Sequence, residues 1–232
     1  MPNRIRIISL DAGNTLIHPH PSVGEVYAQH LAAFGGRADP DSLQQRFLTA
    51  FKTVFDDKPR KTSPGDERAY WREVVRRTLG DRVAADRFDP LFDRLYEAFA
   101  HADCWKPAGG VRDVLENLNR RGYRLIVFSN SDPRIHGVFE ELGMTPYFEK
   151  IYVSAEIGWE KPAGQAFRHV QSDTGVRPEE ILHVGDSVGA DGRGARAAGW
   201  HACLVHPGKD PDDRIPVLPS LRRLPAFLHS LR

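Results

Sequence analysis

Polar side chains of the kinds that handle phosphate and divalent cations stand at or soon after the apolar runs of this chain. They are Asp11, Ser129, Lys161, Asp186 and Asp191. In an open α/β sheet, ligands bind at the carboxyl ends of the strands, so these side chains would meet at one edge of one sheet. Asp186, Asp191 and the main-chain carbonyl of Gly13 offer the hard oxygen ligands that Mg²⁺ prefers, and a lysine and a hydroxyl can hold phosphate oxygens. Together these residues predict a phosphoryl-transfer site.

Taken one at a time, the same residues have simpler explanations. A carboxylate after a strand is usually a turn residue, Ser129 and Asn130 could cap the helix that follows them, and Lys161 could be a solvated surface charge. Glu156 and Glu160 are explained well enough as surface charges. Independent loops would not be expected to deliver two acids, a hydroxyl and a lysine to one sheet edge, so the set favours the phosphoryl-transfer site.

Short apolar runs without polar alternation predict the strands that position these residues, and such runs suit a parallel sheet covered on both faces. The runs are Arg4–Leu10, Arg124–Phe128, Lys150–Val153, Ile181–Val184 and His201–Val205. Helical spacing predicts helices at Val111–Arg121, Pro133–Leu142, Pro162–Thr174 and Gly189–Ala198. The alternation of strand and helix predicts an α/β fold with a doubly wound, parallel, five-stranded Rossmann-like sheet.

A long helical insert interrupts this alternation after the first predicted strand. Its predicted helices are Gly24–Phe34, Pro40–Phe55, Glu67–Leu79 and Phe88–Ala100. We therefore expect a core domain formed by residues 1–16 and 106–232, and a four-helix cap domain formed by residues 17–105.

The composition is that of an ordinary globular protein, with 41% hydrophobic and 27% charged residues among 232. A net charge of +1 provides no global field for nucleic acid or an anionic membrane, so we expect neither partner. The apolar run Ile5–Leu10 is too short to span a membrane and lacks the cleavage pattern of a signal peptide. The default expectation is a cytoplasmic monomer or homodimer. Cys104 and Cys203 have neither a disulfide nor a zinc-ligand spacing, so we expect reduced structural thiols.

Four segments of the chain resemble the four motifs of the haloacid dehalogenase (HAD) superfamily, in the same order. They are IISLDAGNTL, LIVFSNSD, the KP of GWEKPAGQAF, and HVGDSVGADGRGARAAG. The helical insert resembles the C1 cap of subfamily I, and the stretch LIHPHPSVGEVYAQHLAAFGG resembles one branch of that superfamily. The resemblance spans nearly the whole chain.

The resemblance implies a Mg²⁺-dependent hydrolase, most simply a phosphatase acting on a small phosphorylated metabolite beneath a closing cap. Asp11 would be the nucleophile and form an aspartyl-phosphate, with Ser129 and Lys161 as the other catalytic residues. Ser129, Asn130 and Lys161 would bind the substrate. The Mg²⁺ ligands would come from Asp11, Gly13, Asp186 and Asp191.

Gly13 departs from the HAD pattern, because most HAD phosphatases carry a second Asp there as general acid and base. Loss of a proton donor commonly costs about 10²–10⁴ in rate, so we expect poor turnover of ordinary alkyl phosphates. A reactive substrate such as an acyl phosphate would need little acid help. His18 or His20 could replace the acid, and Lys52 could form the Schiff base that the phosphonoacetaldehyde-cleaving members use.

Two alternatives therefore remain open beside the phosphatase. The first is a catalytically weak or inactive HAD protein that binds Mg²⁺ and a phosphorylated ligand, and Gly13 is its motivation. The second is cleavage of a carbon–halogen or carbon–phosphorus bond. The haloacid dehalogenases also lack an acid at this position but need no metal, and then Asp186 and Asp191 have no obvious use.

Overall fold

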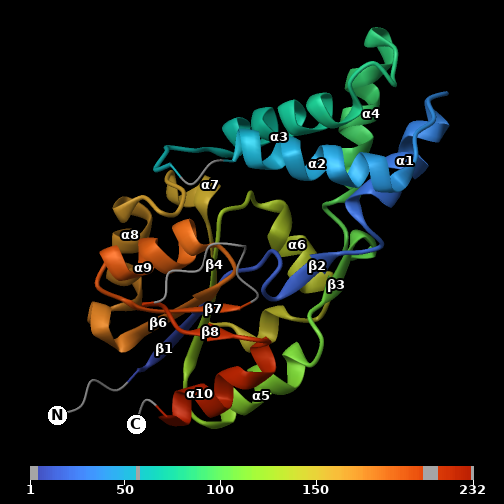
Figure 1. Cartoon of the computed structure of the whole chain (residues 1–232). Helices are drawn as coiled ribbons and strands as arrows, with labels where there is room; N and C mark the ends of the chain where they lie inside the picture. The colour runs from blue at the N-terminus through green and yellow to red at the C-terminus, as the bar shows by residue number, and fades with distance from the viewer. Residues whose placement is uncertain (1–4, 56–57, 206–213, 231–232) are drawn as a thin grey trace.

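A six-stranded parallel sheet forms the centre of the computed structural model, which describes residues 5–55, 58–205 and 214–230 (Figure 1). In spatial order the strands are β5 (Lys150–Val153), β4 (Arg124–Ser129), β1 (Ile7–Leu10), β6 (Ile181–Gly185), β7 (His201–Val205) and β8 (Val217–Leu218). All neighbouring pairs are parallel. The predicted α/β fold class is confirmed, and β8 is an unpredicted sixth strand. Arg4 of the first predicted strand lies outside the described residues.

Helices cover both faces of the sheet because successive strand residues point to opposite sides. The helices are α5 (Val111–Arg120), α6 (Arg134–Glu141), α8 (Gly164–Thr174), α9 (Gly194–Ala197) and α10 (Leu224–Ser230). Ile8 and Leu10 of β1 pack in one hydrophobic cluster with α5, α6 and α10, whereas Ile7 packs in another with α8 and α9. Burial on both faces explains why the strands are continuous apolar runs.

Two predicted details of the core differ from the structure. The helix predicted at Gly189–Ala198 is a π-helical turn at Val188–Arg193 followed by the short helix α9. The short helix α7 (Ser154–Ile157) was not predicted, since four residues are too few for a helical period to be visible in the sequence.

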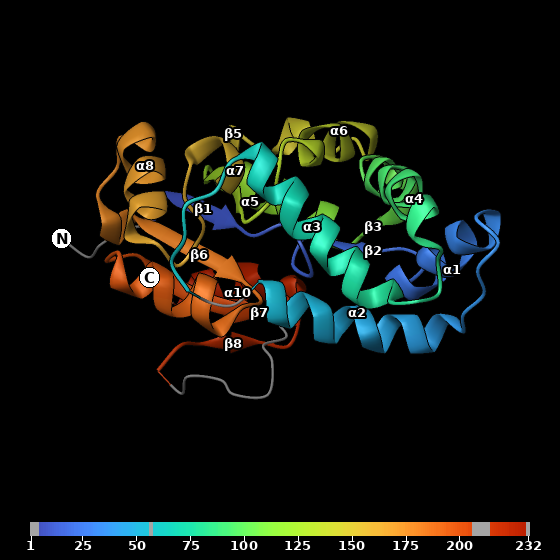
Figure 2. The same cartoon turned by 90° about the horizontal axis from the view of Figure 1, so that it is seen from above.

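The described residues of the insert form four α-helices with a hydrophobic cluster of their own. They are α1 (Val23–Ala33), α2 (Pro40–Val54), α3 (Pro64–Leu79) and α4 (Ala85–Ala98). Helix α3 starts before the predicted Glu67 because the Ser63 side chain accepts from the Asp66 amide at 3.2 Å and Pro64 occupies the first turn. Figures 1 and 2 show the four helices gathered at one side of the core.

A two-stranded antiparallel sheet connects the core and the insert. Its strands are β2 (Ile17–Pro19), where the chain leaves the core, and β3 (Trp105–Pro107), where it returns. The proposed boundary after residue 16 falls at the start of β2, and the one after residue 105 falls one residue inside β3. The division into two domains stays a prediction.

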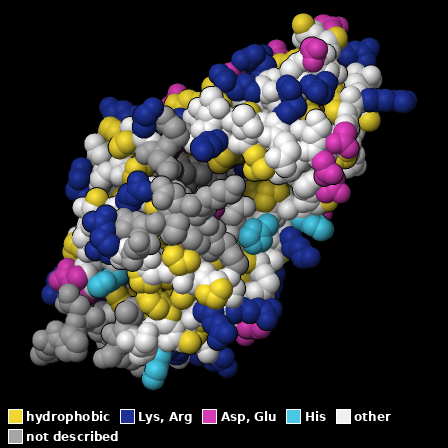
Figure 3. Space-filling model, viewed as in Figure 1, with side chains coloured by type: hydrophobic (Ala, Val, Ile, Leu, Met, Phe, Trp, Pro, Cys, Tyr) yellow, Lys and Arg dark blue, Asp and Glu magenta, His cyan; other side chains and the backbone are white. Residues whose placement is uncertain are grey.

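Positive and negative side chains are mixed on the surface, as the net charge of +1 leads one to expect. On the face in Figure 3, Lys and Arg side chains are spread over the molecule and interspersed with acidic ones. No helix within the described ranges is both long and apolar enough to cross a membrane. Cys104 and Cys203 are both buried and unpaired.

Candidate active site

The carboxyl ends of β1, β4 and β6 bring the predicted site residues to one cavity. Asp11 directly follows β1, Ser129 ends β4, and Asp186 directly follows β6. Lys161 reaches the cavity from the loop before α8, and Asp191 reaches it from the π-helical turn after β6. All seven predicted residues line this cavity: Asp11, Gly13, Ser129, Asn130, Lys161, Asp186 and Asp191. They lie together at one edge of the sheet, as expected for residues that follow parallel strands. Their roles in binding and catalysis stay predictions.

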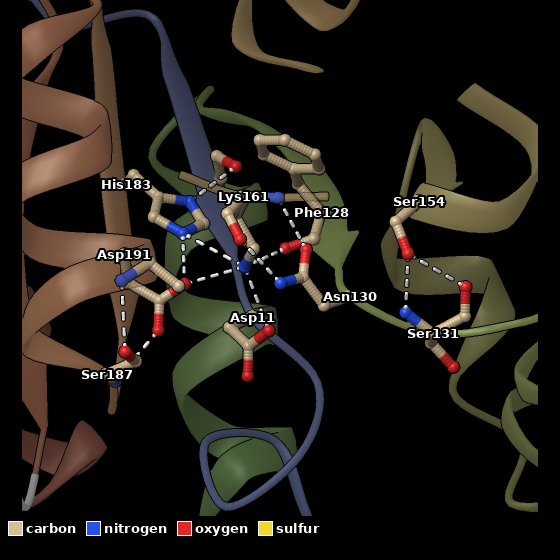
Figure 4. A network of polar contacts seen from close by, with 11 residues as sticks. Asp11, Phe128, Asn130, Ser131, Ser154, Lys161, His183, Ser187 and Asp191 are labelled. Carbon is tan, nitrogen blue, oxygen red and sulfur yellow. Dashed lines mark hydrogen bonds and ion pairs between the residues drawn. The ribbon is translucent and has the colours of Figure 1, made fainter. Parts of the chain in front are cut away.

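Lys161 is the centre of the polar network in Figure 4. Its Nζ donates to Asp11 Oδ1 at 3.0 Å, to Asp191 Oδ1 at 2.6 Å and to the main-chain carbonyl of Phe128 at 2.7 Å. The side chain is only 1% exposed, so the alternative of a solvated surface charge is wrong. Burial by itself would lower the pKa of Lys161, but the two carboxylates raise it above its usual value. The ammonium group therefore stays charged beside Asp11.

Asp191 accepts hydrogen bonds from further groups. Its Oδ1 also lies 3.0 Å from His183 Nε2, and its Oδ2 accepts from the Ser187 amide at 2.9 Å. Because a carboxylate only accepts, we assign the proton to His183 Nε2, and Nδ1 then accepts from the Ser9 hydroxyl at 2.9 Å. Burial and the charge of Lys161 lower the pKa of His183, so its ring is neutral. Burial would raise the pKa of Asp191, but Lys161 and His183 hold it below its usual value.

Three carboxylates provide a donor set that fits Mg²⁺. Asp11, Asp186 and Asp191 each offer one oxygen, and these oxygens lie within 4.8 Å of one another. Burial and the neighbouring carboxylates raise the pKa of Asp186 to about 8, and burial together with Asp191 raises that of Asp11 to about 6 despite Lys161. Three carboxylate oxygens this close together repel one another, and a small divalent cation bound between them would offset that repulsion.

Position 13 has room for a side chain. A Cβ added to Gly13 would meet no heavy atom within 4 Å, and Gly13 lines the cavity. The next residue, Asn14, has a left-handed φ of 56°, and its side chain hydrogen-bonds to Asp186. Asn14 was not predicted as a site residue, although an Asn in a tight turn is a recognisable sequence signal.

Asn130 holds two loops of the site together. Its Nδ2 donates to the Lys161 carbonyl at 2.8 Å, and its Oδ1 accepts from the Lys161 amide at 2.7 Å. Both halves of this side-chain amide therefore position the lysine, and direct contact of Asn130 with substrate stays a prediction. Ser129 is 4% exposed and lines the cavity, where its hydroxyl can reach a ligand.

The insert closes the opposite side of the cavity, which has a volume of about 620 Å³. Small-molecule sites commonly measure about 300–1,000 Å³, so the space suits a small ligand. His18 lines the cavity and remains a candidate for the acid that position 13 lacks. His20 and Lys52 are exposed and are not among the described residues that line it.

The interpretation of Glu160 as a surface charge is wrong, because this residue is only 2% exposed and lines the cavity. Its Oε2 lies 3.0 Å from Nε of Arg60, a residue of the insert. Burial and the neighbouring Glu67 raise the pKa of Glu160 to about 7. Glu156, by contrast, is an exposed partner of His136 at 3.1 Å, as expected for a surface charge. No local pattern separates these two glutamates, since only the folded insert covers one of them.

His183 and Ser9 were also missed by the sequence reasoning. Both lie inside buried strands, β6 and β1, where neighbouring residues are apolar. A polar residue in such a run is a usable signal, because a buried polar group needs a partner.

Comparisons with known proteins agree on the fold. The sequence pattern of the haloacid dehalogenase-like hydrolases matches residues 5–199. The human haloacid dehalogenase-like hydrolase domain-containing protein 3 is 32% identical in an alignment that covers 95% of this chain and 92% of the relative. The magnesium-bound structure of YfnB from Bacillus subtilis matches with a TM-score of 0.73 and 19% identity, covering 97% of this chain and 99% of YfnB. L-2-haloacid dehalogenase from Xanthobacter autotrophicus matches with a TM-score of 0.69 and 18% identity, covering 98% and 100%.

Proposed function

Because the chain belongs to the haloacid dehalogenase-like hydrolases, we propose that it is a Mg²⁺-dependent phosphatase that acts on a small phosphorylated compound. The observation that carries the proposal is the cluster of Asp11, Asp186 and Asp191 with Lys161 at one end of the cavity between the core and the insert. A carboxylate can approach a phosphate only where their mutual repulsion is offset. The Lys161 ammonium group and a Mg²⁺ ion held by the carboxylates would offset it here.

In the proposed reaction, a carboxylate oxygen of Asp11 attacks phosphorus and forms an aspartyl-phosphate. The bond from phosphorus to the leaving-group oxygen breaks, and the leaving group takes the electron pair and then a proton. Water next attacks phosphorus, which releases inorganic phosphate and restores the Asp11 carboxylate. Lys161 and the Ser129 hydroxyl hold phosphate oxygens in both steps, and Lys161 is already charged and within 3.0 Å of Asp11.

Asp11, Asp186, Asp191 and the main-chain carbonyl of Gly13 would hold Mg²⁺. The ion would neutralise charge on the transferred phosphoryl group. The magnesium bound in the structurally similar YfnB supports this assignment.

Gly13 limits the substrates that the proposed enzyme can turn over quickly. With no carboxylic acid at position 13, the leaving group must depart with little proton donation unless His18 supplies it. Acyl phosphates and other phosphates with acidic leaving groups are therefore the favoured substrates.

The test is Mg²⁺-dependent phosphate release from p-nitrophenyl phosphate, acetyl phosphate and a panel of sugar phosphates, with wild type compared with Asp11→Asn. We expect release that needs both Mg²⁺ and Asp11 and that is fastest for acetyl phosphate. Release that persists in Asp11→Asn would exclude the covalent mechanism.

A second candidate is favoured by Gly13 itself: a catalytically weak protein that binds Mg²⁺ and a phosphorylated ligand. Binding of Mg²⁺ and inorganic phosphate without any Asp11-dependent release would select this candidate. Dehalogenation is less well supported, because the resemblance to the Xanthobacter enzyme is one of fold and a metal-free reaction leaves the three clustered carboxylates unexplained.

A further inference from the structure

The insert lines the cavity with a continuous series of aromatic rings. Phe47 and Phe51 lie four residues apart on one face of α2, and Phe55, four residues further on, directly follows the helix as its C-cap. Their ring centroids are 5.8 Å apart for Phe47 and Phe51, and 5.0 Å apart for Phe51 and Phe55. Trp71 of α3 lies 5.8 Å from Phe51 and 5.2 Å from Phe55. All four rings line the same cavity as Asp11.

These rings are not simply the interior of the cap. Phe51 is 38% exposed and its neighbour Leu48 is 50% exposed. Among the described residues, the only other large hydrophobic side chain this exposed is Val217, which is not in the cavity. Exposed apolar surface on a soluble fold is informative when it is contiguous and lies within a concave site. Here it faces the space that is continuous with the phosphate site.

The remaining polar groups of the cavity disfavour a second anionic group on the ligand. Of the described residues that line it, only Lys161 and Arg134 are Lys or Arg. Lys161 serves the phosphate site, and Arg134 is held by Asp132 at 2.9 and 2.7 Å. The charged residues near the rings also include Glu67 and Glu160, which are buried carboxyls, and Arg60. The Arg60 guanidinium lies 5.6 Å from the Phe55 ring centroid, and its Nε is paired with the Glu160 carboxyl at 3.0 Å. A carboxylate or a second phosphate on the ligand would find no unpaired cation among these residues.

We propose that the leaving group of the substrate carries an uncharged aromatic ring, which binds against Phe51, Phe55 and Trp71 while the phosphate lies at Lys161. The inference rests on the proposed phosphatase for the position of the phosphate. It adds the substrate class, an aromatic acyl phosphate or aromatic phosphate ester with a single anionic group. Offset or edge-to-face packing on the wall would supply the binding energy for the ring.

The first test measures binding and needs no turnover. Benzylphosphonate and methylphosphonate are titrated calorimetrically into the full chain in Mg²⁺, because both carry the same phosphonate and differ by one phenyl ring. We expect benzylphosphonate to bind at least about 10-fold more tightly. Equal affinities for the two phosphonates would overturn the proposal.

A matched pair of variants locates the ring. Phe51 can be changed without emptying the cap interior because it is 38% exposed, so Phe51→Ala should fold and should reduce the preference for benzylphosphonate several-fold. Tyr147 is a half-buried aromatic residue of the core that does not appear among the described lining residues, so Tyr147→Ala should keep the wild-type preference. A preference that is unchanged in Phe51→Ala, or that is lost equally in Tyr147→Ala, would contradict the assignment to this wall.

The second test measures turnover of phenylacetyl phosphate and acetyl phosphate, whose leaving groups are both carboxylates and need little acid help. We expect kcat/KM to be at least about 10-fold higher for phenylacetyl phosphate, and the ratio to fall in Phe51→Ala. Equal, Asp11-dependent turnover of both would overturn the aromatic site and keep the phosphatase. Tight benzylphosphonate binding with no turnover of either compound would overturn the phosphatase and keep the aromatic site.

Discussion

Gly13 stands where most HAD phosphatases carry the aspartate that serves as general acid and base. It lines the cavity beside Asp11, and a Cβ placed there would have no heavy atom within 4 Å. Its main-chain carbonyl remains available as a metal ligand whatever the side chain. The absence of a carboxylic acid therefore affects protonation of the leaving group and leaves the other proposed functions of the site in place.

Gly13→Asp should raise kcat/KM for unactivated alkyl phosphates by about 10-fold or more, because the added carboxylic acid can protonate the leaving oxygen. Acetyl phosphate should gain little, since its leaving group departs without help. The measurement is kcat/KM for both substrates, with Gly13→Ala as the control for bulk alone. An unchanged alkyl phosphate rate, with Mg²⁺ binding intact, would show that position 13 is not the defect.

Lys161 provides a second test at the scale of a residue. Its compact ammonium group fits between Asp11, Asp191 and the Phe128 carbonyl, and the Lys161 side chain is only 1% exposed. The planar guanidinium of Lys161→Arg cannot match this arrangement, so Asp11-dependent phosphate release should fall by about 10²-fold or more.

Lys150→Arg is the matched control for this change. Lys150 makes an exposed ion pair with Asp173 at 2.7 Å, where an arginine can replace it. The control should retain wild-type activity in the same phosphate-release assay. Equal activity of both variants would mean that the ammonium geometry at Lys161 is unimportant.

At the scale of elements, the loop between α2 and α3 is joined to the segment that carries Lys161. The Thr62 amide donates to the Gly158 carbonyl at 3.2 Å, and the Glu160 amide donates to the Arg60 carbonyl at 3.1 Å. The Arg60 side chain also lies 3.0 Å from the Glu160 carboxyl. The insert is thus hydrogen-bonded to the core directly beside Lys161, the residue that we propose to bind phosphate.

This junction should make stability depend on pH. Burial and Glu67 raise the pKa of Glu160 from 4.5 to about 7. Between these values the folded state binds more protons at this carboxyl than the unfolded state, so its contribution to stability falls as pH rises. In excess Mg²⁺, the fall in melting temperature between pH 5 and 7.5 should be smaller in Glu160→Gln by on the order of a few °C. The measurement is thermal unfolding across this pH range.

Glu156→Gln controls for the loss of a glutamate charge nearby. Glu156 lies four residues before Glu160 and is exposed. This variant should keep the wild-type pH dependence. A Glu160→Gln profile parallel to that of wild type would show that Glu160 does not titrate with folding in this range.

For the whole molecule, the carboxylate cluster that we propose to bind Mg²⁺ joins segments that are far apart in the sequence, because Asp11 follows β1 whereas Asp186 and Asp191 follow β6. A site of this kind exists only in the folded chain, so Mg²⁺ should stabilise the fold. At 100 times its dissociation constant, a ligand specific for the folded state adds about 2.7 kcal/mol. For a chain of this size this amounts to roughly 5–10 °C in melting temperature.

The check is the melting temperature with and without Mg²⁺ in wild type, Asp186→Asn and Asp81→Asn. The increase should be lost in Asp186→Asn and retained in Asp81→Asn, whose carboxylate is fully exposed outside the cavity. An equal increase in all three proteins would indicate nonspecific ion binding.

The sequence by itself determined five strands of the sheet and the residues that follow them. Apolar runs and caps are local signals, and parallel strands all end at the same edge, so Asp11, Ser129 and Asp186 could be placed together without coordinates. The short strand β8 and the short helix α7 could not, because segments of two and four residues carry no visible period.

Only the tertiary structure decided which groups face one another. Asp11 and Lys161 are separated by 150 positions, and nothing local in the sequence states that Lys161 also contacts Asp191 and the Phe128 carbonyl. The Phe47, Phe51 and Phe55 stripe is plain in the sequence, but an apolar stripe on a helix packs inward far more often than it lines a site. The placement of α2 and α3 against the core turns it toward the cavity, and the same packing buries Glu160 while leaving Glu156 exposed.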